Sequence, residues 1–195
     1  MIKYHIRQSN GKGGIMAKKR KHLVIMTDIG DTIIDESTEV RNEQDIVVHA
    51  ACIPGARETY LALYEAGYTI LMVADGRTPS FRNTMREQGM GHIFSAWIIS
   101  DAIGEEKPSP RMFSAAMEAA GLTEKDKDRV IMIGNNVRRD IRGANLFGIR
   151  SVLLDWSRRR SFDEELPSDR AQYRIHTPAE LLPLAERLEM ELSAK

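Results

Sequence analysis

Short apolar segments rich in β-branched residues alternate with segments of helical period along this chain, and this alternation constrains the fold more than any other feature. The apolar segments are expected to be strands at residues 23–26, 69–73, 97–99, 130–133 and 151–154. Strands that alternate with helices form βαβ units around a parallel sheet. Strands covered by helices on both faces are almost continuously apolar, as these are. The sequence therefore predicts an α/β domain with a parallel sheet.

The predicted helices carry start and stop signals: proline, serine or threonine at their first residues and glycine at their ends. They are expected at residues 54–67, 78–89, 109–121 and 136–147. A last helix starts at the capping box Thr177-Pro178-Ala179-Glu180. The charged segment 157–171 is expected to be a loop.

Charge and cysteine content exclude several classes of protein. The chain has 28 basic and 28 acidic side chains, which argues against general binding to nucleic acid. The single cysteine, Cys52, lies among apolar residues and is expected to pack rather than react. No apolar run approaches the roughly 18 residues of a membrane span, and we see no apolar signal core. We expect a cytoplasmic protein that binds neither membrane nor specific nucleic acid.

Residues 1–21 are polar and lack an apolar period, so a flexible tail is expected before one domain at 22–195. The segment GKGGIM at 11–16 is what a purine-rich ribosome-binding site would encode if read in frame. Met16 is therefore an alternative start. The basic run at 18–21 is expected to be a solvated approach to the first strand.

Polar residues follow the predicted strands at the edge where ligands collect in an open parallel sheet. They are Asp28 after the first strand, Lys107 before the helix at 109–121, and Asn135 and Asp140 after the fourth strand. An acid, an ammonium group and amide or carboxyl oxygens that converge can hold a metal ion and a phosphate group. The sequence therefore predicts one site at this edge.

The order and spacing of these segments resemble the haloacid dehalogenase (HAD) superfamily of phosphohydrolases. The segments 24–32, 53–76, 104–121 and 130–154 follow the order of the four family motifs, and the similarity covers about residues 22–190. The most specific are KPSPRMFSAAMEAAG from Lys107 and GNNVRRDIRGANLFG from Gly134. The resemblance implies a three-layer Rossmann-like core of five or six parallel strands. It also implies that Asp28 attacks phosphorus, while Lys107 neutralises the phosphate charge.

The same resemblance implies a cofactor and a set of phosphate contacts. Mg²⁺ would bridge Asp28, the main-chain carbonyl of Gly30 and Asn135, with Asp140 in the surrounding shell. Substrate would be bound by Lys107 and by the segment after the second strand, which comprises Ala74, Asp75, Gly76 and Arg77.

Three positions depart from the family pattern. Gly30 stands where the family has an acid that protonates the leaving group and then activates water, and such help is worth about 10² to 10⁴ in rate. Asp31 is expected to point away from the reacting centre, although its substitution for that acid stays open. Ala74 removes a hydroxyl, which Arg77 or nearby amides could replace. Asn135 replaces a metal-binding acid by a neutral amide, so Mg²⁺ binding should be weaker.

The chain has no room for a cap domain, because only residues 29–68 lie between Asp28 and the second strand. Selectivity must then come from rim loops, a partner subunit or a macromolecular substrate. Arginines near the predicted mouth form either a basic border for an anionic ligand or ion pairs on a solvated surface. They are Arg138, Arg139, Arg142, Arg158, Arg159 and Arg160, and the acids considered are Asp140, Asp155, Asp163, Glu164 and Glu165.

Two main interpretations follow. The first is a Mg²⁺-dependent HAD phosphatase or phosphotransferase that acts through an aspartyl-phosphate on Asp28, slowly because of Gly30, on a phosphorylated small molecule or macromolecule. The alternative is a catalytically degenerate HAD domain that binds a phosphorylated ligand or a protein. A dehalogenase acting at carbon is a third, weaker interpretation. Assembly into a homo-oligomer is left open.

Overall fold

The sheet has six parallel strands in the order β5-β4-β1-β6-β7-β8 in the computed structural model, which describes residues 20–194 apart from residue 158. The strands are β1 (Val24–Thr27), β4 (Thr69–Ala74), β5 (Phe94–Ile99), β6 (Val130–Gly134), β7 (Arg150–Leu154) and β8 (Tyr173–Ile175). β1 lies at the centre, with Val24 aligned with Thr69 on one side and Val130 on the other. The predicted α/β class and parallel sheet are confirmed.

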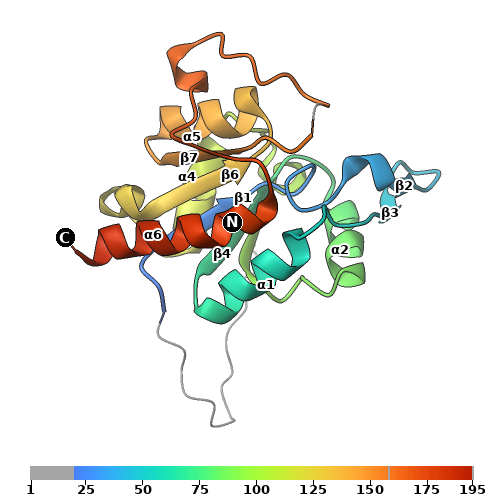
Figure 1. Cartoon of the computed structure of the whole chain (residues 1–195). Helices are drawn as coiled ribbons and strands as arrows, with labels where there is room; N and C mark the ends of the chain where they lie inside the picture. The colour runs from blue at the N-terminus through green and yellow to red at the C-terminus, as the bar shows by residue number, and fades with distance from the viewer. Residues whose placement is uncertain (1–19, 158, 195) are drawn as a thin grey trace.

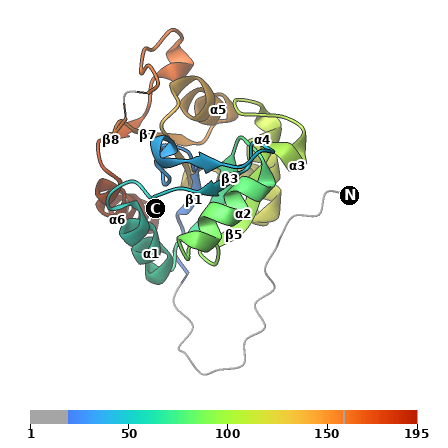
Figure 2. The same ribbon diagram turned by 90° about the vertical axis from the view of Figure 1, so that its right-hand side faces the viewer.

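Helices cover both faces of the sheet, which gives three layers (Figures 1 and 2). α1 (Ala56–Ala66) and α6 (Leu181–Ser193) pack on one face, and α4 (Pro110–Ala119) and α5 (Arg142–Phe147) on the other. Neighbouring residues of β1 serve different layers, since Ile25 packs with Tyr60 and Leu188 whereas Met26 packs with Phe113. This alternation is expected of a strand buried on both faces.

The start and stop signals act as predicted at several helix ends. Gly67 follows α1 with φ 95° and donates its amide to the last turn, a left-handed conformation that glycine adopts without steric cost. The hydroxyl of Ser109 accepts the amide of Arg111 at 3.2 Å at the start of α4. Before α6, Glu180 accepts the amide of Thr177 at 2.9 Å, which confirms the capping box.

The helix predicted over 136–147 is present, but its first part is not α-helical. It begins with a π-helical turn, η3 (Val137–Ile141), which continues directly into α5. The side chain of Asn136 accepts the amides of Arg138 and Arg139 at 3.1 and 3.2 Å, and the wider turn directs Asp140 into the protein. Such turns inside helices are often found at functional sites.

Three further elements differ from the predicted set. The third strand begins at Phe94 rather than near Trp97, a short helix α3 (Ser100–Ile103) follows it, and β8 adds a sixth strand. β8 has only three residues, of which Ile175 alone is fully buried, so its apolar pattern is too short to identify. The remaining short 3₁₀ turns are η1 (Glu36–Thr38), η2 (Glu124–Arg129), η4 (Pro167–Asp169) and η5 (Pro178–Glu180).

A small hairpin of β2 (Val40–Arg41) and β3 (Val47–His49) stands between β1 and α1. α2 (Thr78–Glu87) supports it, because the hydroxyl of Ser80 accepts the amide of Val47 at 3.1 Å and Asn83 donates to the carbonyl of Val47 at 2.9 Å. This insertion contains the hairpin and the η1 turn but no cap domain, as the short spacing predicts.

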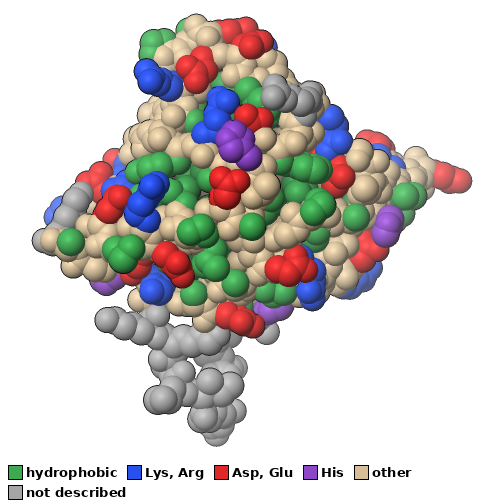
Figure 3. Space-filling view, viewed as in Figure 1, with side chains coloured by type: hydrophobic (Ala, Val, Ile, Leu, Met, Phe, Trp, Pro, Cys, Tyr) green, Lys and Arg blue, Asp and Glu red, His purple; other side chains and the backbone are tan. Residues whose placement is uncertain are grey.

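Acidic and basic side chains are interspersed over the face formed by α6 and α1 (Figure 3). None of the helices within the described residues is both long and apolar enough to cross a membrane. Cys52 is half-buried, and burial raises the pKa of its thiol to about 11, in line with a packing role. The predicted tail up to residue 19, including the alternative start at Met16, lies outside the described residues.

Candidate active site

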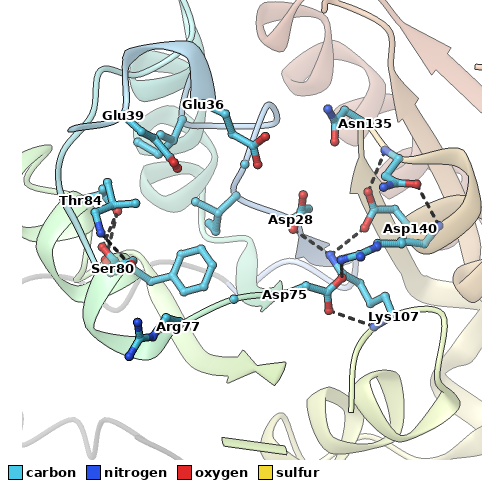
Figure 4. A pocket seen from close by; sticks show the side chains of 18 of the residues that line it. Asp28, Glu36, Glu39, Asp75, Arg77, Ser80, Thr84, Lys107, Asn135 and Asp140 are labelled. Carbon is cyan, nitrogen blue, oxygen red and sulfur yellow. Dashed lines mark hydrogen bonds and ion pairs between the residues drawn. The ribbon is translucent and has the colours of Figure 1, made fainter. Parts of the chain in front are cut away.

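Lys107 joins two carboxylates at the carboxyl edge of the sheet (Figure 4). Its Nζ lies 2.8 Å from Oδ1 of Asp28 and 2.7 Å from Oδ1 of Asp140. It also donates to the carbonyl of Val73 at 2.8 Å. An ammonium group has three protons to donate, so this cation is fully engaged. Oδ2 of Asp28 has no such partner among the residues that the structure describes.

The surroundings keep Lys107 charged. Burial alone would lower the pKa of its ammonium group, but the carboxylates of Asp140, Asp28 and Asp75 outweigh this effect and raise the pKa above its ordinary value. Burial raises the pKa of the Asp140 carboxyl, whereas Lys107 opposes that rise. The site therefore holds a permanent cation beside Asp28.

Asp75 fixes the main chain that carries Lys107. Its Oδ1 accepts the amide of Lys107 at 2.9 Å, and its Oδ2 accepts from Arg139 at 3.2 Å. Gly134 lets Asp140 approach the end of β6, because a Cβ at residue 134 would lie only 2.1 Å from Asp140 Oδ2. Asp140 Oδ2 also accepts the amide of Asn136 at 3.0 Å. The predicted residues Asp28, Lys107 and Asp140 are therefore brought together.

Asn135 and Gly30 present uncharged oxygen atoms near Asp28. Asn135 is 1% exposed, and its amide nitrogen makes no hydrogen bond within the described part of the chain. Figure 4 shows its oxygen turned to the side of Asp28. In the first loop the amide of Ile34 donates to the carbonyl of Ile29, and the amide of Asp31 donates to the carbonyl of Ile34. Among the described residues, these loop hydrogen bonds leave the carbonyl of Gly30 without a main-chain partner. These oxygens are hard ligands of the kind that Mg²⁺ prefers.

This donor set contains few carboxylates. Within the described residues no three acidic, histidine or cysteine side chains gather as a metal-binding group. Mg²⁺ is commonly bound by one or two carboxylates together with water and substrate phosphate. Asp28, the carbonyl of Gly30 and the amide of Asn135 fit that pattern, with weaker charge than a pair of carboxylates would supply.

The segment predicted to bind phosphate after β4 is largely engaged with the protein itself. Ala74 is fully buried. The amide of Gly76 donates to the hydroxyl of Ser100 at 2.9 Å. Arg77 lines the pocket from its outer end and donates to the carbonyl of Gln44 at 2.5 Å. Asp75, Gly76 and Arg77 all line the pocket, and Arg77 is the one among them with a positive charge to offer a ligand.

Glu36 is a pocket residue that sequence reasoning missed. A Cβ at residue 30 would lie 2.1 Å from Oε1 of Glu36, so its carboxylate occupies the space of the missing side chain. Burial and then the nearby Asp31 carboxylate raise the pKa of Glu36. No local pattern could have revealed this placement, because it depends on how the chain turns between residues 30 and 36.

Asp31 points away from the pocket, as expected. It is fully buried, and Arg159 binds both of its oxygens, one at 2.7 Å. Trp156 donates to its carbonyl at 2.9 Å, and its Oδ1 accepts the amide of Glu36 at 3.1 Å. Asp31 therefore anchors the η1 turn and does not replace the acid missing at residue 30.

The arginines near the mouth are mostly paired with acids. This favours ion pairs on a solvated surface over a basic border for an anionic ligand. The pairs are Arg138 with Glu165, Arg139 with Asp75 and Glu106, Arg142 with Asp169, Arg159 with Asp31 and Asp35, and Arg160 with Glu36. Except for Glu165, these partners are not the acids considered from the sequence. Arg158 lies outside the described residues.

The pocket around Asp28 and Lys107 has a volume of ≈ 180 Å³. Its floor is polar, formed by Asp28, Lys107 and Asn135, and its outer walls come from the hairpin and from α2. Typical ligand pockets are about 300 to 1,000 Å³, so this one suits a small group.

Comparison with known proteins places the chain among phosphatase relatives and HAD-like hydrolases. Curated relatives include the glyceraldehyde 3-phosphate phosphatase of Methanopyrus kandleri, 27% identical over 69% of this chain and 57% of the relative. The phosphoserine phosphatase of Thermus thermophilus is 33% identical over 52% of this chain and 39% of the relative. The chain thus matches less than two thirds of the length of either relative.

A solved structure shares the fold. The HAD phosphatase from Thermococcus onnurineus superposes with a TM-score of 0.68 at 17% identity, covering 83% of this chain and 97% of the other. The family model of the haloacid dehalogenase-like hydrolases matches residues 4–148. This stretch contains Asp28, Gly30, Lys107, Asn135 and Asp140. This protein therefore belongs to the haloacid dehalogenase-like hydrolases.

Proposed function

We propose that this protein is a Mg²⁺-dependent phosphatase that acts on a small phosphorylated molecule through an aspartyl-phosphate on Asp28. The observation that carries the proposal is the pairing of Asp28 Oδ1 with the buried ammonium group of Lys107 at 2.8 Å. This pairing leaves Oδ2 of Asp28 as the attacking oxygen. The curated relatives are phosphatases of small phosphorylated compounds, which supports the same reaction class.

The residues of the chain supply most of what the reaction needs. A carboxylate can approach a phosphate dianion only if positive charge compensates the repulsion, and Lys107 holds that charge 2.8 Å from Asp28. Asp28, the carbonyl of Gly30 and Asn135 would hold Mg²⁺, with Asp140 behind them. When bound, the ion would neutralise charge on the phosphate oxygens and orient the phosphate group.

The sheltered part of the pocket, with a volume of ≈ 180 Å³, has room for a phosphate group and a short chain. Arg77 lies at its outer end and donates to the main-chain carbonyl of Gln44 rather than to a carboxylate. An anionic group on the far end of the substrate would find a charge partner there. Arg77 would then contribute to selection among small phosphates.

The test is phosphate release by the purified protein from aryl and alkyl monophosphates, with Mg²⁺ and with a chelator. Turnover should need Mg²⁺ and should disappear in Asp28→Asn, which keeps the size of the side chain but removes the nucleophile. Activity that survives in Asp28→Asn would overturn the proposal. Phosphate binding without turnover would instead favour the degenerate binding domain, for which the loss of charge at Asn135 is the supporting observation.

A further inference from the structure

The carboxylate of Glu36 fills the position that a side chain at residue 30 would take. A Cβ at Gly30 would lie 2.1 Å from Oε1, 3.0 Å from Cδ and 3.3 Å from Cγ of Glu36. Non-bonded atoms cannot approach so closely, so the pocket has room either for a side chain at residue 30 or for Glu36 as it stands. Glycine at residue 30 is what allows Glu36 to enter.

The main chain holds Glu36 in this orientation. Its amide donates to Asp31 Oδ1 at 3.1 Å, and Asp31 is itself bound by Arg159. Asp35 caps the same turn by accepting the amide of Ser37 at 2.9 Å. Figure 4 shows the side chain of Glu36 reaching into the pocket above Asp28. The turn therefore aims the carboxylate at the space next to the nucleophile.

Glu36 is also the least engaged acid of the pocket wall. Glu39 and Asp45 both pair with Arg41, at 2.6 and 3.2 Å. Asp75 and Asp140 are held by Lys107 and its neighbours. Among the residues that the structure describes, the only ion pair of Glu36 is a 3.6 Å contact between its Oε2 and the half-exposed Arg160. Its Oε1 remains available to a reacting group.

We propose that Glu36 is the general acid and base of this enzyme, replacing the acid that the family carries at residue 30. This inference rests on the proposed phosphatase function. In the first step Oδ2 of Asp28 bonds to phosphorus, the bond to the leaving oxygen breaks, and that oxygen takes its electron pair and the proton of Glu36. In the second step Glu36 takes a proton from water, and the water oxygen bonds to phosphorus. The bond to Asp28 then breaks, and its electron pair returns to the carboxylate.

The test compares Glu36→Gln on two classes of substrate. An alkyl phosphate needs a proton on its leaving oxygen, so its kcat/KM should fall about 10²-fold or more. An aryl phosphate with a good leaving group should lose less than about tenfold in kcat/KM. Its kcat should still fall, and the phosphorylated protein should accumulate, because no base activates water. Glu43→Gln, an exposed acid of the same insertion, is the matched control and should behave as wild type.

A second variant tests whether a carboxylate in this space is what turnover requires. Gly30→Asp combined with Glu36→Ala should restore turnover of the alkyl phosphate, because the shorter side chain at residue 36 vacates the space and Asp returns a carboxylate to it. Equal loss on both substrates without an accumulated intermediate, or no loss, would overturn the role of Glu36. If Asp28→Asn still removes all activity in that case, the proposed phosphatase function holds and only the role of Glu36 fails. A wild-type protein that turns over neither substrate would overturn both.

Discussion

Lys107 is the residue on which the charge balance of the site depends. Its side chain and that of Asp140 are each 1% exposed, and they lie 2.7 Å apart. Removing one partner of a buried ion pair leaves the other charge uncompensated, which is far more costly than replacing both. The stability of this site can therefore be tested separately from its chemistry.

Lys107→Met should lower the free energy of unfolding by about 3 to 5 kcal/mol and abolish turnover. The double variant Lys107→Met with Asp140→Asn should recover part of that stability, since Asp140 no longer carries a buried charge, but should stay inactive. Urea unfolding at neutral pH measures the free energy of unfolding of both variants. A single variant as stable as wild type, or a double variant no more stable than the single one, would contradict the argument.

Asn135 sets the strength of metal binding in this account. Asn135→Asp adds a charge beside Asp28, and two unit charges about 4 Å apart interact by roughly 4 kcal/mol near a protein surface. We expect Mg²⁺ to bind at least about tenfold more tightly. In the absence of Mg²⁺ the variant should melt at a lower temperature than wild type, because two carboxylates then repel each other.

Thermal unfolding over a range of Mg²⁺ concentrations checks this expectation without any activity assay. Asn42→Asp makes the same change on the exposed hairpin, where the side chain only accepts main-chain amides, and should show no new response to Mg²⁺. An unchanged response of Asn135→Asp would remove Asn135 from the metal site.

The central residues of the site could be predicted from the sequence, whereas Glu36 could not. Asp28, Lys107 and Asp140 meet as expected, because Asp28 and Asp140 come after β1 and β6 and Lys107 lies shortly before α4, all at the same edge of the sheet. Glu36 could not be found in this way, since its place depends on a turn anchored by Asp31 and Arg159. Those two are 128 residues apart in the chain, so no local spacing relates them.

Among the elements, the η1 turn and the segment after β7 act together. Arg159 pairs with the buried Asp31 and with Asp35 at 2.7 Å. Trp156 donates to the main chain of Asp31 from the same segment. The segment after β7 thus holds the turn that carries Glu36, although it lies at the opposite end of the sequence.

Arg159→Ala should loosen this turn. We expect a loss of about 1.5 to 3 kcal/mol in the free energy of unfolding, typical of hydrogen bonds to charged groups. The kcat/KM for an alkyl phosphate should fall about ten- to hundredfold, the scale set by misplacement of a catalytic group. Aryl phosphate should be affected less.

Arg138→Ala is the matched control for this change, because its ion pair with Glu165 is exposed on both sides. Exposed pairs contribute about 0 to 1 kcal/mol. Similar effects from the two arginine variants would show that Arg159 has no special part in placing the turn.

Elements with long apolar patterns were predictable, and those shaped by polar contacts were not. β4 is buried at every position, and its run of apolar residues is evident from the sequence. The π-helical turn at Val137–Ile141 follows from the side chain of Asn136 and from the burial of Asp140, neither of which periodicity reports. β8 depends on pairing with β7 at its edge.

At the scale of the whole molecule, the three-layer core brings the site residues to one edge of the sheet, and the hairpin and α2 close part of its mouth. The described chain has no cap domain between β1 and α1. Under the proposed function, selection of substrate would rest on the small pocket and on rim residues such as Arg77. The predicted absence of a cap followed from the short spacing between Asp28 and the second strand, whereas the way the hairpin encloses the pocket depends on its packing against α2.

The central claim is that Asp28 carries the phosphoryl group during turnover. The most direct measurement mixes the protein with Mg²⁺ and an aryl or acyl phosphate, stops the reaction in acid, and determines intact mass and the modified peptide. We expect one phosphoryl group on Asp28 that forms and decays with product release, and none on Asp28→Asn. Steady turnover with no modification of Asp28, or a phosphoryl group on another residue, would contradict the account.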